Sequence, residues 1–88
     1  TQIVTKHGAT YRVLATSSLH DINKLLEIPF LESDDYDTLA GLLMLQKSDG
    51  LKEGDEFELE GYLIKVVKMV RHLPEVVELR LADNHPDL

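Results

Sequence analysis

The spacing of apolar residues near the N-terminus predicts two short strands. Ile3-Val4 is apolar, and Tyr11, Val13 and Ala15 alternate with Arg12 and Leu14. His7-Gly8 between these stretches has the composition of a turn. We therefore expect the chain to begin with two strands joined by this turn.

The period of the pattern then becomes helical. Ser18 lies three residues before Asp21, which is the arrangement of a capping box with Asp in place of Glu. Pro29 is expected to end the helix, because the residue before a proline avoids helical backbone angles. The apolar residues that recur at helical spacing are Leu19, Ile22, Leu25 and Leu26.

A second helix is predicted by the sequence SDDYDTLAGLLM. Ser33 or Asp34 is placed to cap it, and the further aspartates would lie at the positive end of the helix dipole. Ser48-Asp49-Gly50 is expected to close the helix. Its apolar residues cover more than one stripe, which predicts packing on two faces; they are Leu39, Ala40, Leu42, Leu43 and Leu45.

Gly41 lies inside this second helix, where a glycine costs about 0.8–1 kcal/mol relative to alanine. Close approach of a neighbouring backbone would offset this cost. We therefore expect the substitution Gly41→Leu to destabilise the domain through overpacking.

The remaining chain has the period of β-strands. Phe57 and Leu59 alternate with glutamates, which predicts a strand with one buried and one solvated face. Glu60-Gly61 fits a tight hairpin turn, and Tyr62 to Val70 is apolar in both phases, which predicts a central strand. His72 to Glu75 is expected to turn the chain. A third strand follows, with the alternating apolar residues Val77, Leu79 and Leu81.

The resulting order, β-β-α-α-β-β-β, predicts one α+β domain in which a small, mostly antiparallel sheet packs on two helices. The length of 88 residues suits a single domain. A formal net charge of −7 argues against binding to nucleic acid or to anionic lipid. Because cysteine is absent, disulfides and thiolate metal sites are excluded.

Residue types that carry catalysis are present but form no recognisable set. Ser17-Ser18 lacks the glycines of a nucleophile elbow, and Gly50, Gly54 and Gly61 do not follow the order of a phosphate loop. The histidines show no zinc spacing. We therefore expect no enzymatic activity and no cofactor. The four histidines are His7, His20, His72 and His85.

Asp34, Asp35 and Asp37 leave two interpretations open. They are the acidic start of a buried helix, or they bind a divalent cation through carboxylate oxygens. Three acids in four residues do not converge on one point without ligands from elsewhere. We therefore favour the first interpretation and expect no metal site.

The order of three motifs, LHDINKLLEI, DDYDTLAGLLM and EGDEFELEGYLIKVVKMV, resembles the CorC/HlyC transporter-associated domain. Gly54-Asp55 matches a Gly-Asp pair of that family, and Gly61 matches its hairpin glycine. The last hairpin of the family often carries a glycine and a basic pair, where this chain has His72 to Glu75. The central signature is matched in order by Asp35, Tyr36, Asp37, Thr38, Leu39, Ala40 and Gly41.

The resemblance implies that residues 1–82 form such a domain, similar in fold to flavin-binding domains, with a polar tail at 83–88. It implies a non-catalytic regulatory and interaction domain of a hemolysin-like membrane protein, similar to magnesium and cobalt efflux proteins. The domain would modulate ion transport from the cytoplasmic side of the inner membrane, beside a CBS pair and a membrane domain. A homodimer through an exposed sheet edge is a further expectation.

Two alternative functions remain open. The fold analogy allows binding of an adenine nucleotide or of FAD, although the chain lacks a phosphate loop. The aspartate cluster allows a divalent-metal sensor that uses Asp34, Asp35 and Asp37.

Overall fold

The computed structural model describes residues 3–47 and 49–81, and the expected tail at 83–88 lies outside these ranges. The α+β class and the predicted order of elements are confirmed. Neither helix in the described ranges is long or apolar enough to cross a membrane. The elements are β1 (Val4–His7), β2 (Thr10–Leu14), α1 (Leu19–Asn23), α2 (Leu39–Gln46), β3 (Glu56–Leu59), β4 (Tyr62–Val70) and β5 (Leu73–Leu81).

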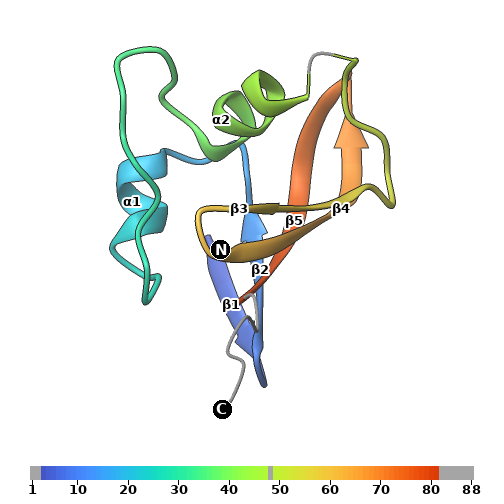
Figure 1. Cartoon of the computed structure of the whole chain (residues 1–88). Helices are drawn as coiled ribbons and strands as arrows, with labels where there is room; N and C mark the ends of the chain where they lie inside the picture. The colour runs from blue at the N-terminus through green and yellow to red at the C-terminus, as the bar shows by residue number, and fades with distance from the viewer. Residues whose placement is uncertain (1–2, 48, 82–88) are drawn as a thin grey trace.

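The strands form one antiparallel sheet in the order β1-β2-β5-β4-β3 (Figure 1). β5, the last strand in the sequence, lies in the middle and joins the first hairpin to the last two strands. β4 has a strand on each side, as its apolar character predicted. The central position itself, however, belongs to β5.

Two irregularities interrupt the pairing of β4 with β5. The register shifts between Val66 and Lys68 and again between Lys68 and Met69, so Val67 and Glu75 are the extra residues. The carbonyl of Glu75 instead accepts a hydrogen bond from the Ala15 amide at 2.8 Å. The bulge in β5 therefore ties this strand to the end of β2.

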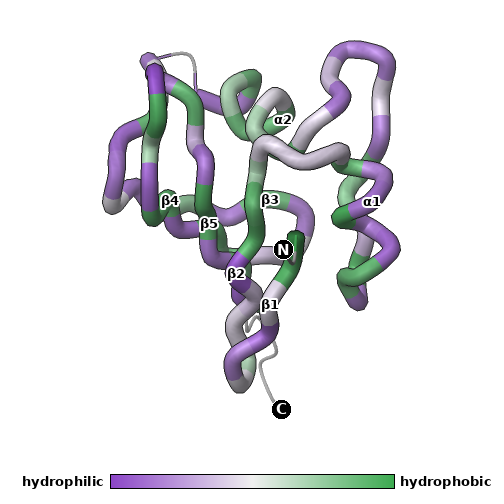
Figure 2. The backbone as a smooth tube through the Cα atoms, turned by 180° about the vertical axis from the view of Figure 1, so that it is seen from behind, coloured by the Kyte–Doolittle hydropathy of each residue, from purple (hydrophilic) through white to green (hydrophobic). Residues whose placement is uncertain are grey.

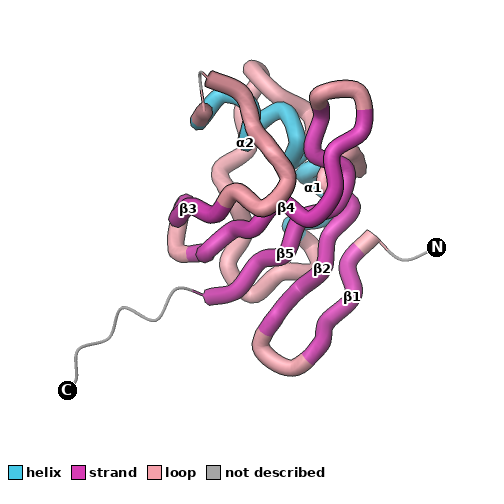
Figure 3. Tube along the Cα trace, turned by 90° about the vertical axis from the view of Figure 1, so that its right-hand side faces the viewer, coloured by secondary structure: helices cyan, strands magenta, loops and turns pink. Residues whose placement is uncertain are grey.

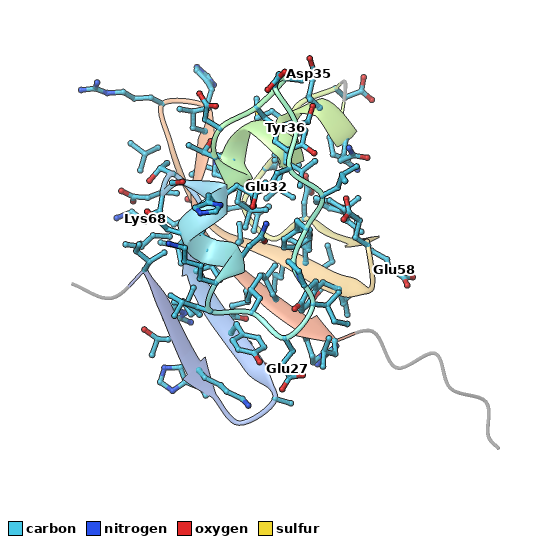
Figure 4. All side chains as sticks on the ribbon, turned by 90° about the vertical axis from the view of Figure 1, so that its left-hand side faces the viewer. Glu27, Glu32, Asp35, Tyr36, Glu58 and Lys68 are labelled. Carbon is cyan, nitrogen blue, oxygen red and sulfur yellow. The ribbon has the colours of Figure 1, made fainter. Side chains whose placement is uncertain are left out.

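Both helices cover the same face of the sheet, and the opposite face is open. The strands lie in front of the helices in Figure 3, and the helices lie in front of the strands in the opposite view of Figure 4. The core lies between these two layers. Its buried side chains include Val13, Leu19, Ile22, Leu39, Leu43, Tyr62, Ile64, Val66, Val77 and Leu79.

The start of α1 differs from the prediction. Ser18 makes no side-chain cap hydrogen bond, so the expected capping box with Asp21 is wrong. The backbone of Ser18 forms an isolated bridge with Thr38, and the Leu19 amide donates to the Asp37 carbonyl at 2.8 Å. The free amide of Leu19 in the first turn thus finds its hydrogen-bond acceptor in a distant segment. A capping box would have used only side chains next to the helix.

The end of α1 also comes earlier than predicted, at Asn23 rather than at Pro29. The Asn23 side chain accepts a hydrogen bond from the Phe30 amide and donates one to the Phe30 carbonyl, both at 2.9 Å. These bonds hold the chain in a loop. Leu26 is buried, but Leu25 is 54% exposed and does not belong to a buried helix face.

The helix α2 begins at Leu39 and its N-cap is Thr38, so the expected caps Ser33 and Asp34 are wrong. The Thr38 side chain accepts a hydrogen bond from the Gly41 amide at 3.0 Å, and the first turn holds no acidic residue. The three aspartates therefore precede the helix and do not meet its dipole within the first turn. Of the five apolar residues on which packing on two faces was predicted, Leu45 is 60% exposed and takes no part, whereas the other four are buried.

Two turns differ from the prediction, and one is confirmed. His7 pairs with Thr10, so the first turn consists of Gly8-Ala9 rather than His7-Gly8. Leu73 already pairs with Val70, so the last turn is Arg71-His72 and β5 begins earlier than expected. Glu60-Gly61 is the two-residue turn between β3 and β4, as predicted.

Candidate functional site

The loop between the helices, residues 24–38, is the candidate site. We call it the interhelical loop. It includes the three aspartates and leads into α2, and Figure 2 shows its part before α2 as hydrophilic. A loop of this length in a small domain needs anchors, because fixing its backbone costs conformational entropy.

The hairpin of β3 and β4 supplies two of these anchors. The Ile28 amide donates a hydrogen bond to the Tyr62 hydroxyl at 3.0 Å, and the Leu31 amide donates to Oε1 of Glu60 at 2.9 Å. The Tyr62 ring is buried and lies beside Phe30, with 5.1 Å between the ring centroids. Burial raises the pKa of the Tyr62 hydroxyl above its usual value.

Glu32 provides a third anchor from within the loop. It accepts a hydrogen bond from the Asn23 side chain at 3.1 Å, and its carboxylate lies 3.3 Å from Nδ1 of His20. The Asn23 bond and the nearby His20 lower the pKa of Glu32 against a smaller opposing effect of burial. Figure 4 shows Glu32 in front of α1.

Tyr36 folds the loop back on itself. Its hydroxyl donates a hydrogen bond to the Leu31 carbonyl at 2.6 Å, and loss of hydration raises its pKa, with further contributions from the charges of Glu60 and Asp35. Just before it, the Asp35 amide donates to Oγ of Ser33 at 3.1 Å. Tyr36 thus closes the loop immediately before α2.

Gly41 packs against this turn. A Cβ atom at Gly41 would lie 3.1 Å from Cβ of Tyr36 and 3.8 Å from its Cα. A close neighbour is present at this glycine, but it is the side-chain Cβ of Tyr36 rather than the backbone that was expected, because the Tyr36 Cα lies at an ordinary contact distance. Thr38 caps the helix, Leu39 and Ala40 are buried, and the Ala40 amide donates to the Ala15 carbonyl at 2.7 Å. The signature segment therefore builds the junction of loop and helix.

The aspartates of this segment are not arranged as a group of metal ligands in the described residues. Asp34, Asp35 and Asp37 are all exposed, and Asp37 takes part in the fold through its backbone carbonyl. Within residues 3–47 and 49–81, no three acidic, histidine or cysteine side chains are grouped as metal ligands would be. The metal interpretation of these three residues gains no support.

The other signature residues also have structural positions. Gly54 adopts a φ of +92°, and its amide donates to the Val66 carbonyl at 2.8 Å. Asp55 accepts a hydrogen bond from the Lys52 amide at 2.9 Å. Gly61 adopts a φ of +92° and lies against Ile28 of the interhelical loop. The two glycines meet backbone angles that other residues rarely adopt.

Sequence reasoning missed three residues that hold the loop, namely Asn23, Glu32 and Glu60. Each is a common polar residue in a helix or turn, and its partner lies in another segment. His20 was predicted as a scattered histidine and lies against Glu32, whereas His7 and His72 are exposed at hairpins. His85 lies outside the described residues.

The interhelical loop also presents apolar side chains to solvent. Leu25, Ile28 and Leu31 are 54%, 44% and 69% exposed, and the exposed aspartates follow in the same loop. We call Leu25, Ile28, Leu31, Asp34, Asp35 and Asp37 the loop surface. Large apolar residues exposed to solvent are typical of a surface that meets another protein.

Comparison with known proteins places this geometry in a family. The family model described as the transporter associated domain CorC_HlyC matches residues 4–83. The Bacillus subtilis (strain 168) protein named UPF0053 protein YugS is 35% identical over 81 residues, which are 91% of this chain. The chain spans only 18% of the length of that relative.

Solved structures have the same fold. A CorC_HlyC transporter associated domain from Nitrosomonas europaea superposes with a TM-score of 0.81 at 19% identity, covering 93% of this chain and 99% of that one. A transporter associated domain from a CBS domain protein of Porphyromonas gingivalis gives 0.76 at 24% identity, covering 91% and 98%. At these identities the similarity shows the fold alone.

A third structure was solved with metal ions. It is the CorC_HlyC domain of a Xylella fastidiosa Temecula1 hemolysin in complex with Mg²⁺ and Mn²⁺, with a TM-score of 0.76 at 16% identity and coverage of 93% and 100%. The fold likeness agrees with the two stronger findings, the family model over residues 4–83 and the 35% identity to the Bacillus protein. Together they show that this chain belongs to the CorC_HlyC transporter associated domain family.

Proposed function

We propose that this chain is a non-catalytic regulatory domain that modulates cation transport by docking on the rest of a larger membrane protein. The domain would lie on the cytoplasmic side of the cell membrane, next to a CBS pair and a membrane domain. Magnesium and cobalt are the proposed cations, by analogy with the efflux proteins of this family.

One observation carries the proposal: the loop surface combines exposed leucine and isoleucine with exposed aspartates on a loop that the fold anchors firmly. Burying three large apolar side chains would contribute on the order of several kcal/mol to association before the entropic costs of binding. The acidic residues favour a partner surface that carries lysine or arginine. The small share that this chain has of its relative's length is consistent with partners in the same protein.

Substitution of one exposed leucine tests the docking role. Leu31→Glu, at a position 69% exposed, should weaken binding of the chain to the remainder of its parent protein by about 10-fold or more, because it puts a charge into an apolar contact. The measurement is a titration of labelled chain with the purified remainder, together with cation efflux of the full parent protein in cells. Equal affinities of Leu31→Glu and wild type would refute this docking surface.

Leu45→Glu is the matched control. Leu45 is 60% exposed but belongs to α2, outside the loop surface. The same change of chemistry at a similar exposure should leave both binding and efflux near the wild-type values.

The two alternative functions are not proposed. Within the described residues no phosphate-binding loop accompanies the fold analogy with flavin-binding domains, and no comparison supports nucleotide binding. The metal ions of the Xylella domain belong to that protein, and the three aspartates of this chain do not converge.

A further inference from the structure

The open face of the sheet carries a row of alternating charges across four strands. The register places Arg12 of β2 beside Glu78 of β5, Glu78 beside Lys65 of β4, and Lys65 beside Glu56 of β3. Residues directly opposite each other in a sheet share one face. Val77, adjacent to Glu78, is buried in the core, so these four residues lie on the face away from the helices. We call them the charged row.

Only two of the four residues in the charged row form an ion pair with each other among the described residues. Arg12 and Glu78 form an ion pair at 2.7 Å and keep 53% and 29% of their side-chain surface exposed. Lys65 and Glu56 are also exposed, and among the described residues neither forms an ion pair. Lys65 and Glu56 therefore remain open to ion pairs with another molecule, although the register places opposite charges beside each other in this row.

Apolar residues flank the row on the same face. Leu14 and Val76, which pair with each other, lie on one side of it, and Leu63 lies on the other. These three apolar residues are half-buried, and the register places Leu63 between the exposed Arg80 and Glu58. A shallow hollow of about 150 Å³ lies over the middle of the row, between Lys65 and Glu78. The face thus has apolar area that a partner could cover and space for its side chains.

When the order of the four charges is reversed, each position receives the opposite sign. From β2 to β3 the signs are plus, minus, plus, minus, because the row reads Arg12, Glu78, Lys65, Glu56. A two-fold axis parallel to the strands, between β5 and β4, reverses this order in a second copy. Arg12 then faces Glu56 of the second copy, and Glu78 faces Lys65 of the second copy. Every charge in the row meets its opposite.

Other two-fold arrangements lack this property. An axis along the row, perpendicular to the strands, would place Arg12 opposite Arg12 and Glu78 opposite Glu78. Like charges in direct opposition cost several kcal/mol at an interface.

We propose that the open sheet face binds a second copy of this chain, with the two-fold axis parallel to the strands between β5 and β4. The dimer is isologous, because the same patch serves both copies. The second copy would be one partner of the proposed interaction domain. The evidence for it is the strand register and the charges of the open face. The sequence predicted a homodimer through an exposed edge of the sheet. The proposed dimer uses the open face of the sheet instead.

Sedimentation velocity of the 88-residue chain over a wide concentration range tests the proposal. The solved relatives that this fold covers almost completely show that a domain of this size folds without further domains. Wild type should show a concentration-dependent dimer. Lys65→Glu and Glu78→Lys should each raise the dissociation constant on the order of 100-fold, because each creates two symmetry-related pairs of like charge.

Mixing the two variants gives the sharper result. A Lys65→Glu chain and a Glu78→Lys chain oppose each other with complementary charges at all four positions, so the mixture should form a heterodimer although each variant alone is monomeric. The double variant Lys65→Glu/Glu78→Lys restores an order that is complementary to its own reversal, and it should dimerise again.

Matched controls separate pairing from net charge. Glu27→Lys, in the interhelical loop, and Lys52→Glu, before β3, change the net charge by the same amounts at exposed positions outside the open sheet face. Both should dimerise like wild type, and circular dichroism should show that every variant is folded.

Two results would overturn the proposal. A wild-type chain that stays monomeric at the highest concentration has no such dimer, and its open face is left to a different partner. Single variants that dimerise like wild type place the interface elsewhere. Neither result touches the docking role, which depends on the loop surface and on binding to the rest of the parent protein.

Discussion

The two tight turns at the ends of β4 have the same backbone form and very different surroundings. In the first, Glu60 and Gly61 have φ values of +51° and +92°; in the second, Arg71 and His72 have φ values of +53° and +69°. Both are two-residue turns with two positive φ angles, which suit the twist of a hairpin and favour Asn-Gly. Only the first contains a glycine.

The first turn belongs to a packed junction. Glu60 accepts the Leu31 amide, Tyr62 accepts the Ile28 amide, and Gly61 touches Ile28. Gly41 and Tyr36 complete the same junction from the start of α2. Gly61 suits the positive φ of its position, and Gly41 leaves room for the contact with Tyr36.

The second turn is exposed and has no such partners. Arg71 and His72 are both exposed, and in residues 3–47 and 49–81 no hydrogen bond involves either side chain. Two nine-residue strands, β4 and β5, hold the turn in a conformation that its own residues disfavour. The difference teaches that long strand pairing can impose a turn, whereas a turn that anchors a loop needs the right residue.

The largest expected effect comes from overfilling the junction. Gly41→Leu should lower the free energy of unfolding by about 3 kcal/mol, because the new side chain meets Tyr36 at a distance shorter than normal contact. Urea unfolding followed by circular dichroism measures the loss. Gly41→Ala is the control, since its gain in helix propensity offsets part of the contact. A stable Gly41→Leu variant would show that the loop gives way freely.

A smaller loss is expected at the anchored turn. Gly61→Val should cost about 2 kcal/mol, because a β-branched residue strongly disfavours a φ of +92°. Thermal unfolding of this variant beside Gly61→Asn checks the cause. Asn tolerates positive φ, so it should lose clearly less; equal losses would point to packing against Ile28 rather than to the backbone.

The exposed turn should respond in the opposite direction. Replacing Arg71-His72 by Asn-Gly should raise the free energy of unfolding by about 1 kcal/mol, because both new residues accept positive φ. For a domain of this size that is a rise in Tm of about 4–8 °C, measurable by calorimetry. Arg71→Lys keeps the strain and should change little. An unchanged Tm in the Asn-Gly variant would mean that the turn is not strained.

The smallest effect concerns the anchor itself. Glu60→Ala should cost about 0.5 kcal/mol, because an exposed hydrogen bond to the Leu31 amide contributes little on balance. Amide hydrogen exchange should show faster exchange at Leu31. Glu58→Ala removes an exposed glutamate of the same strand and should leave that amide protected; if both variants expose it equally, Glu60 is not the anchor.

The strands and their order along the chain were predictable from the sequence. Part of the site was predictable as well. Alternation of Phe57 and Leu59 with glutamates identifies β3, and the signature from Asp35 to Gly41 marks the junction with α2. The bonding at the start of α1 was not predictable, whereas α2 has a local side-chain cap at Thr38. Ser18 pairs with Thr38 and Leu19 with Asp37, so bonds between distant segments replaced the local ones that the sequence suggests.

The sequence by itself determined the α+β class, the presence of one buried face per strand, the glycine turn before β4 and the membership of the family. These follow from local periodicity and from residues whose backbone freedom is special. Only the tertiary structure decided that β5 lies between β2 and β4, and this placement aligns Arg12, Glu78, Lys65 and Glu56 in one row. The physical reason is that strand order and register depend on pairings between residues far apart in the chain, which no local pattern encodes.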